Sequence, residues 1–292
     1  MEKSIEARLE EIFKEWYERM YSEKSYLEDK KEPFTKDGIL FNENIPANII
    51  EDMWKLSSRR VLFLLKDQNQ KGKDKWFEDI RDWLRVTEFD RDKEHNKNSD
   101  KSIAQKEKNK NLKNKFLCRM AFLIWGLSKL TTNTVDDWPE GEVIAAHKKG
   151  DVKDLFNTIP FALVECKKLP GGPKLYDNIL LGHLDEYGDF LTQEIETLNP
   201  NIIVCSGNRI FEFVVKYFSQ SNEIEKLPNI YGGEYEIDGK KVPNFTTCLW
   251  YDQEKNIVVI NSFHPSDRVE NWMYFEKVMS PFRAFIREHS DF

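Results

Sequence analysis

The 292-residue sequence lacks several features that would place it in a broad class of proteins. It has no uninterrupted apolar run near the roughly 18 residues that a membrane helix needs, and its charged start leads into an amphipathic stretch instead of a signal peptide. Its four cysteines, at 118, 166, 205 and 248, include no Cys-x-x-Cys pair. We therefore expect a cytoplasmic protein without a membrane partner, a metal or another cofactor.

A net positive charge is also absent. The sequence carries 44 Lys and Arg against 51 Asp and Glu, a formal charge of -7, which argues against a protein that coats nucleic acid without specificity. The charge is uneven, because residues 91–119 hold ten basic and four acidic residues, a local balance of +6. The Lys/Asn-rich insertion at 91–115 is interpreted either as a solvated loop or as a clamp on a DNA backbone that uses Lys106, Lys108, Lys110 and Lys113.

Four aliphatic runs bounded by polar residues predict strands buried on both faces. They lie at 61–65, 161–166, 202–206 and 257–263, with amphipathic stretches between them. Strands that alternate with helices favour a parallel sheet. The predicted fold is therefore α/β, a three-layer α/β/α sandwich around a central, mainly parallel four-stranded sheet. With 40% hydrophobic residues the chain can bury one large core, and we expect a single domain over 1–292.

Local patterns predict the other elements. Apolar residues at helical spacing indicate helices at 5–21, 47–54, 76–84, 116–130, 189–198, 210–218 and 270–288. The rest of 22–54 looks irregular, so residues 1–54 are interpreted as a helical N-terminal extension. The dipeptide Asp238-Gly239 predicts a small β-hairpin at 235–242.

Two predicted strands end in residues suited to catalysis. The first runs into Asp67, and the last runs into His264-Pro265-Ser266. In open α/β sheets, ligands bind just beyond the carboxyl ends of the strands. We therefore expect Asp67 and His264 to face each other.

These segments resemble the uracil-DNA glycosylase superfamily, in which one motif ends a strand with Asp and the last motif reads His-Pro-Ser. Two further family elements are matched by the strand after Pro200 that ends in Gly207 and by the strand 161–166, and all four follow the family's order. The resemblance covers residues 55–285. It implies a monomeric DNA glycosylase that needs no cofactor and acts on a base flipped out of duplex DNA.

Cleavage of a glycosidic bond builds positive charge on the sugar and negative charge on the departing base. The resemblance implies that Asp67 orients water and stabilises the sugar cation, while His264 donates a hydrogen bond to the base. It also implies a base-binding set, Lys66, Gln68, Asn69, Phe77, Glu165 and Asn261, and DNA contacts from Ser266 and Arg268. Structural roles remain open alternatives: a turn or helix cap for Asp67 and Ser266, a packed ring for His264, and a surface position for Arg268.

Three residues depart from the pattern of uracil-specific members. Asn69 replaces a Tyr that blocks substituents on carbon 5, Glu165 replaces a base-reading Asn, and Arg268 replaces a Leu that fills the gap behind a flipped nucleotide. A carboxyl group accepts from the amino group of cytosine, and its protonated form also donates to the ring nitrogen. We therefore predict excision of a 5-substituted cytosine, such as glucosylated hydroxymethylcytosine in phage DNA, as in bacterial antiviral defence.

Other interpretations remain open from the sequence. Glu165 is alternatively a structural partner of Lys167 or Lys168. The chain is alternatively a uracil-DNA glycosylase of base-excision repair, a catalytically silent nucleic-acid-binding module, or a hydrolase of a small nucleotide-like ligand.

Overall fold

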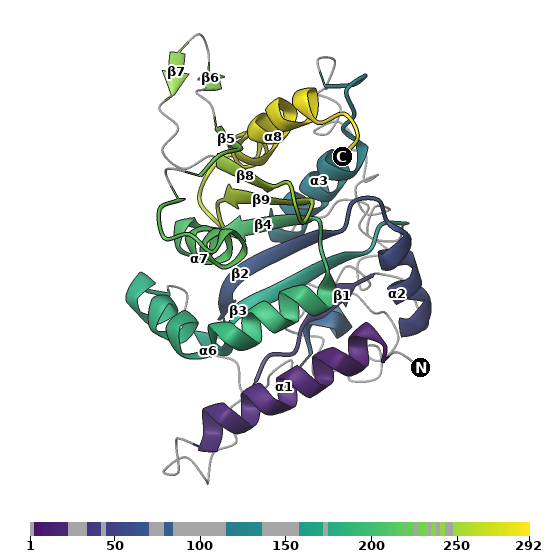
Figure 1. Ribbon diagram of the computed structural model, residues 1–292, viewed down its shortest axis with the longest axis vertical. Helices are drawn as coiled ribbons and strands as arrows, with labels where there is room; N and C mark the ends of the chain where they lie inside the picture. Colours follow the sequence, from purple (N-terminus) through teal and green to yellow (C-terminus); the bar gives the residue numbers. More distant parts are fainter. Residues whose placement is uncertain are drawn as a thin grey trace.

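The computed structural model describes residues 3–22, 34–41, 45–69, 79–83, 115–135, 158–171, 175–224, 227–232, 235–237, 240–242 and 248–292. Within these ranges the chain forms a mixed α/β fold with six α-helices, one seven-stranded sheet and a separate two-stranded hairpin (Figure 1). The α/β class expected from the sequence is thus confirmed.

Four parallel strands form the centre of the sheet, and they are the four expected from the aliphatic runs. β2 (Val61–Asn69) lies between β3 (Phe161–Gly171) and β4 (Ile202–Ser206), and β9 (Ile257–Ser262) pairs with the other side of β4. The first five residues of each strand are buried. Burial on both faces explains why each strand reads as a continuous apolar run.

The expectation of a four-stranded sheet is wrong, because three antiparallel strands extend it to seven. β1 (Gly38–Leu40) pairs with β3, β8 (Cys248–Asp252) pairs with β9, and β5 (Ile230–Gly232) pairs with β8. These strands have three, five and three residues, respectively. Segments this short carry too few alternations for a periodic pattern to stand out.

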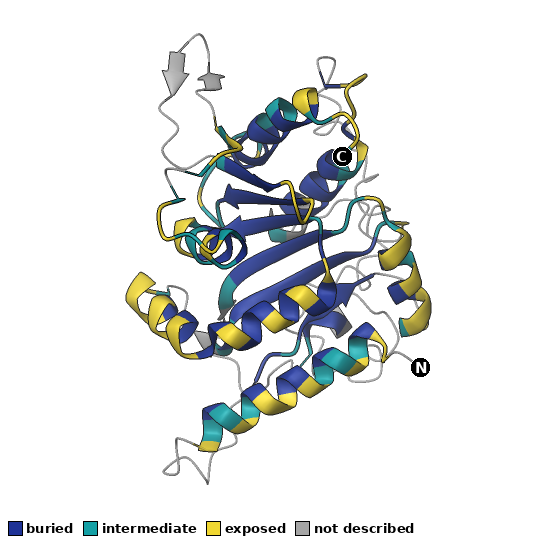
Figure 2. Cartoon of the chain, viewed as in Figure 1, coloured by how far each residue is buried: buried dark blue, intermediate teal, exposed yellow. Residues whose placement is uncertain are grey.

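Helices cover both faces of the sheet. One face packs against α3 (Lys115–Lys129) and α8 (Asn271–Glu288), and the other against α1 (Ile5–Ser22), α2 (Ala47–Leu56), α6 (Asp177–Leu198) and α7 (Asn208–Ser219). Figure 2 shows α1 and α6 as alternating buried and exposed stripes, the pattern of helices packed along one side. The sequence predicted these helices, and the hairpin of β6 (Tyr235–Ile237) and β7 (Lys240–Val242) is also confirmed.

The helix α6 begins earlier than expected, at Asp177 instead of near residue 189. Its first half contains Gly182 and Gly188, which weaken a helical signal because glycine is a poor helix former. A Cβ at Gly188 would lie 2.7 Å from the ring of Phe213, so a larger residue there would have to displace that ring. The helix ends at Asn199, whose left-handed φ of 49° suits an asparagine cap.

A fully buried ionic cluster joins the N-terminal extension to the sheet. Lys168 of β3 donates to both carboxylate oxygens of Asp37, at 2.6 and 2.7 Å, and its Nζ lies 2.8 Å from Oε2 of Glu194 in α6. All three side chains are 0% exposed. The same ammonium lies 5.2 Å from the ring centroids of Phe13 and Trp16 in α1. The first helix therefore packs over a charged group as well as over apolar core.

Several expectations fall on residues that the structure does not describe. The Lys/Asn-rich insertion at 91–115, except for its last residue, lies outside the described ranges, and so does Phe77. Of the helix expected at 76–84, only 79–83 is described, and it contains the 3₁₀ turn η2 (Ile80–Trp83).

Candidate active site

The central strands bring polar side chains to one edge of the sheet, at their carboxyl ends. Phe63 and Leu65 of β2 belong to the core under α3 and α8, and Asp67 continues the same alternation. In the parallel register Asp67 lies opposite Lys167 of β3. The strand order therefore places a carboxylate and an ammonium group side by side at this edge.

Asp67 is nearly buried and paired with a cation. Its side chain is 6% exposed, and its Oδ2 lies 3.3 Å from Nζ of Lys167. Burial raises the pKa of Asp67 above its ordinary value, and the positive charges of Lys167 and Lys66 oppose that rise. Lys66 points instead toward α6, where its Nζ lies 3.7 Å from Oδ1 of Asp177.

His264 lies in a tight turn that follows β9. Its backbone N–H donates to Oδ2 of Asp267 at 3.2 Å, and the backbone N–H of Asp267 donates to the carbonyl of His264 at 2.9 Å. The backbone N–H of Ser266 donates to Nδ1 of the His264 ring at 3.1 Å. Because Nδ1 accepts, the neutral ring carries its proton on Nε2. His264 is thus set up as a hydrogen-bond donor through Nε2.

A buried arginine from α3 holds this turn in place. Arg119 donates through Nη1 to the carbonyls of Pro265 and Asp267, at 3.0 and 2.8 Å, and through Nη2 to the carbonyl of Val269. Its guanidinium also lies 4.9 Å from the ring centroid of Tyr274 in α8. Five fixed N–H donors suit arginine to binding several carbonyls at once. Arg119 of α3 therefore holds the turn that carries His264, and Tyr274 of α8 packs against the guanidinium group.

Asp67 and His264 follow strands that are separated only by β4. Strands lie about 4.8 Å apart, so two spacings place the ends of β2 and β9 roughly 10 Å from each other, with Ser206 and Gly207 between them. Gly207 has φ of 118°, a conformation that side chains disfavour. The two strand ends therefore lie at the same edge of the sheet, with the end of β4 between them.

The other predicted base-binding residues lie at different places around this edge. Glu165 is 4% exposed and stands two residues before Lys167 on β3, and its backbone N–H donates to Oδ2 of Asp37 at 2.8 Å. Asn261 is 3% exposed, and its Nδ2 donates to Oδ1 of Asn208 at the start of α7 at 2.7 Å. The alternation of β9 directs Asn261 toward the α7 face, whereas Glu165 shares the α3 and α8 face with Asp67.

The remaining predicted residues are placed only in part. Gln68 and Asn69 form the last residues of β2, and only their backbone is described. Ser266 and Arg268 are both exposed in the turn after β9, close in sequence to His264. Phe77 and the four lysines at 106, 108, 110 and 113 lie outside the described residues.

Sequence reasoning missed Lys167, Arg119 and Lys277, all of which border this edge. The ammonium of Lys277 in α8 lies 3.6 Å from the ring centroid of Phe263, the residue before His264, and burial lowers the pKa of Lys277 to about 8. A usable signal existed for Lys167. A strand that continues past Cys166 must send one of two adjacent lysines to each face.

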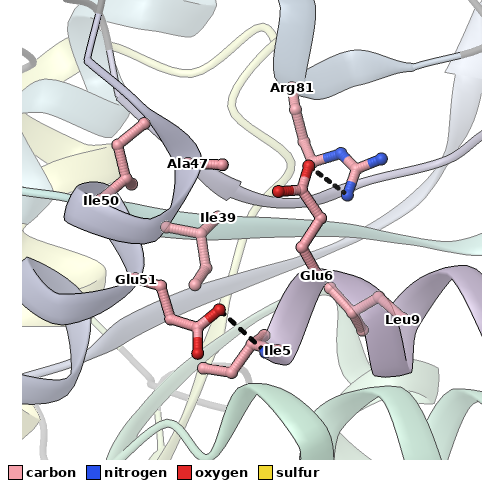
Figure 3. A pocket seen from close by; sticks show the side chains of 8 residues that line it. All are labelled: Ile5, Glu6, Leu9, Ile39, Ala47, Ile50, Glu51 and Arg81. Atoms are coloured by element: carbon pink, nitrogen blue, oxygen red, sulfur yellow. Dashed lines mark hydrogen bonds and ion pairs between the residues drawn. The ribbon is translucent and has the colours of Figure 1, made fainter. Parts of the chain in front are cut away.

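The described residues contain a small cavity elsewhere, between α1, α2, β1 and η2. Figure 3 shows Glu6 directed toward Arg81, and Glu51 accepting the backbone N–H of Ile5 at 2.8 Å. Its volume of about 20 Å³ suits one water molecule and excludes a base. In the same described ranges, no group of three or more His, Cys, Asp or Glu forms a candidate metal site, and no helix is long and apolar enough to cross a bilayer.

Comparison with known proteins gives one match. The family model of the uracil DNA glycosylase superfamily matches residues 111–288, a range that includes β3, β4, β9 and His264 but begins after β2 and Asp67. No curated protein and no solved structure matches the chain significantly. The matched range covers more than half of the 292 residues. The chain belongs to the uracil DNA glycosylase superfamily.

Proposed function

We propose that this protein is a monofunctional DNA glycosylase, a cytoplasmic monomer that hydrolyses the N-glycosidic bond of a modified pyrimidine flipped out of duplex DNA. The observation that carries the proposal is the placement of Asp67 and His264 at the ends of β2 and β9, on either side of β4. Members of this superfamily are generally DNA glycosylases. The preferred base in this proposal is a 5-substituted cytosine, such as glucosylated hydroxymethylcytosine in phage DNA.

The two residues supply complementary chemistry. Asp67 orients a water molecule toward C1′ of the sugar, and its negative charge favours the cationic transition state. The new O–C1′ bond forms as the C1′–N bond breaks, and the bonding electrons leave with the base. His264 donates through Nε2 to the departing base, consistent with the hydrogen bond from Ser266 to Nδ1. The proton lost by the water passes to Asp67 or to solvent.

The choice of base rests on Glu165 and Asn69. Glu165 is nearly buried on the same face of β3 as the partner of Asp67, where a protonated carboxyl group would donate to the ring nitrogen of cytosine and accept from its amino group. Asn69 takes the place of a bulky ring at the end of β2. Arg268, exposed in the turn after His264, is available to fill the gap left by the flipped nucleotide.

The first experiment measures abasic sites by alkaline strand cleavage. Matched duplexes carry uracil, cytosine, hydroxymethylcytosine or glucosylated hydroxymethylcytosine at one position. Asp67→Asn should slow base release by about 10²- to 10⁴-fold while DNA binding persists. Asp189→Asn is the matched control. Asp189 is an exposed residue of α6 that pairs with Arg19 of α1, away from the strand ends.

Each substrate pattern has its own consequence. Cleavage limited to the modified cytosines, lost in Asp67→Asn and kept in Asp189→Asn, supports the proposal. Cleavage of uracil alone would replace it with a repair glycosylase and remove the roles given to Glu165 and Asn69. DNA binding without cleavage of any duplex would favour a silent binding module.

A further inference from the structure

The sequence motifs include Asp67 but not its partner Lys167. Lys167 lies directly across from Asp67 in the parallel register, and its Nζ is 3.3 Å from Oδ2. The two side chains are 11% and 6% exposed, so water screens them little. The proposed catalytic carboxylate is therefore one half of a protected ion pair.

Lys167 is fixed at its other side by its own strand. Its Nζ donates to the carbonyl of Leu169 at 2.8 Å. This bond limits the rotamers of a long side chain and sets the position from which the ammonium meets Asp67. A carboxylate has two oxygens that accept hydrogen bonds. Among the described residues, Lys167 contacts this carboxylate at Oδ2, so we assign Oδ1 to the water molecule.

The charges around Asp67 differ in how directly they act. Among the described residues, the charges that act on the ionisation of Asp67 are those of Lys167 on β3 and Lys66 on β2. Glu165 lies on the same face of β3, and Arg119 and Lys277 come from the helices packed against that face. The titratable ring of His264 follows β9, and the end of β4 contributes the uncharged Ser206 and Gly207. Burial raises the pKa of Asp67, and Lys167 opposes this more strongly than Lys66 does. Lys66 is 31% exposed and is directed toward Asp177.

We propose that Lys167 is a positioning residue for Asp67, which keeps the carboxylate ionised and turns Oδ1 toward the attacking water. This inference rests on the proposed glycosylase function. It assigns to β3 a charged residue that the reaction needs but that contacts neither sugar nor base. The pair follows from the register of β2 and β3.

The experiment compares single-turnover rates across pH for the wild type, Lys167→Met and Lys167→Arg. Without the neighbouring cation, Asp67 should ionise about one to three pH units later. The acid limb of the Lys167→Met profile should therefore shift to higher pH. On the acid side the rate should fall by about 10- to 1,000-fold, and it should recover as pH rises. Lys167→Arg should restore most of the limb, and KM for DNA should change little.

Lys255→Met is the matched control. Lys255 also pairs with a carboxylate, since its Nζ lies 3.2 Å from Oδ2 of Asp252 at the end of β8, but it is half exposed and lies at the end of β9 opposite to His264. Its pH profile should match that of the wild type. A pH-independent loss in Lys167→Met, or an acid limb that stays in place, would overturn the proposed role.

Two further readouts separate this inference from the proposed function. Borohydride trapping of a covalent adduct between Lys167 and DNA would overturn it, because the amine would then attack C1′ itself. If the wild type cleaves no substrate, ¹³C NMR titration of Asp67 still tests the pair. A higher midpoint in Lys167→Met supports the effect of Lys167 on Asp67 even as the glycosylase proposal fails, and an unchanged midpoint overturns it.

Discussion

Lys167 and Lys168 are neighbours in β3, yet they meet carboxylates in two different environments. Lys167 reaches Asp67 at the carboxyl end of the strands, in an edge pair that keeps 11% and 6% exposure. Lys168 reaches Asp37 and Glu194 in the buried cluster, where none of the three side chains is exposed. The comparison shows that the two sets of charges differ in their exposure to solvent.

Burial and neighbouring charges also shift the pKa values within the buried cluster of Asp37, Lys168 and Glu194. Burial and the nearby Asp37 carboxylate raise the pKa of Glu194 well above its ordinary value. Burial alone would lower the pKa of Lys168, but Asp37 and Glu194 outweigh it and raise that pKa. The cluster therefore favours the charged form of Lys168 and the neutral form of Glu194, which reduces the charge held in an apolar surrounding.

The largest effect should come from breaking the buried cluster. Lys168→Met leaves Asp37 and Glu194 buried without a cation, and we expect a loss of about 3–5 kcal/mol in the free energy of unfolding. Urea denaturation measures it. Lys167→Met is the control and should lose less than half as much, because its pair keeps some exposure and holds one carboxylate instead of two. Equal losses in the two variants would remove the distinction between the pairs.

A smaller effect is expected where a buried cation binds carbonyls instead of carboxylates. Arg119→Lys keeps the charge but loses the fork that holds the turn after β9. We expect about 1.5–3 kcal/mol less stability, together with slower base release, because His264 is no longer fixed. Denaturation and single-turnover assays report the two effects. A variant as stable and as active as the wild type would contradict the anchoring role.

The third effect is the dependence of stability on pH. Unfolded Glu194 has a pKa near 4.3, whereas the folded value is raised, so the folded chain binds one more proton between these values. Glu194 therefore makes stability fall as pH rises through this window, by up to about 1.4 kcal/mol per pH unit. Glu194→Gln should flatten that slope in urea denaturation from about pH 5 to 8. An unchanged slope would mean that Glu194 is ionised in the folded protein.

The sequence was sufficient for the parallel centre of the fold. Residues 61–65 and 257–260 are apolar because both of their faces are covered, so their pattern is strong, and the polar residues that follow them mark the edge where Asp67 and His264 lie. The edge strands β1, β5 and β8 were missed. They are short, and pairing with a neighbour defines them more than their composition does.

Side-chain partners could not be predicted in the same way. Lys167 and Asp67 are 100 residues apart in sequence, and Arg119 and Pro265 are 146 apart. Such pairs depend on the register between strands and on where a helix packs on the sheet, and no local sequence pattern encodes either. The sequence offered Lys167 and Lys168 only as alternative partners of Glu165, and their opposite faces are assigned once β3 is known to continue to Gly171.

The first helix packs on residues that are synthesised much later, and this order matters while the chain is being made. Arg19 of α1 bonds to Asp189 of α6, 170 residues later. At about 5–20 residues per second, the ribosome needs roughly 10–35 s to make that partner. During this interval the apolar stripe of α1 has no α6 to cover it. The N-terminal helix is thus the segment most exposed to chaperones and to aggregation while the rest of the chain emerges.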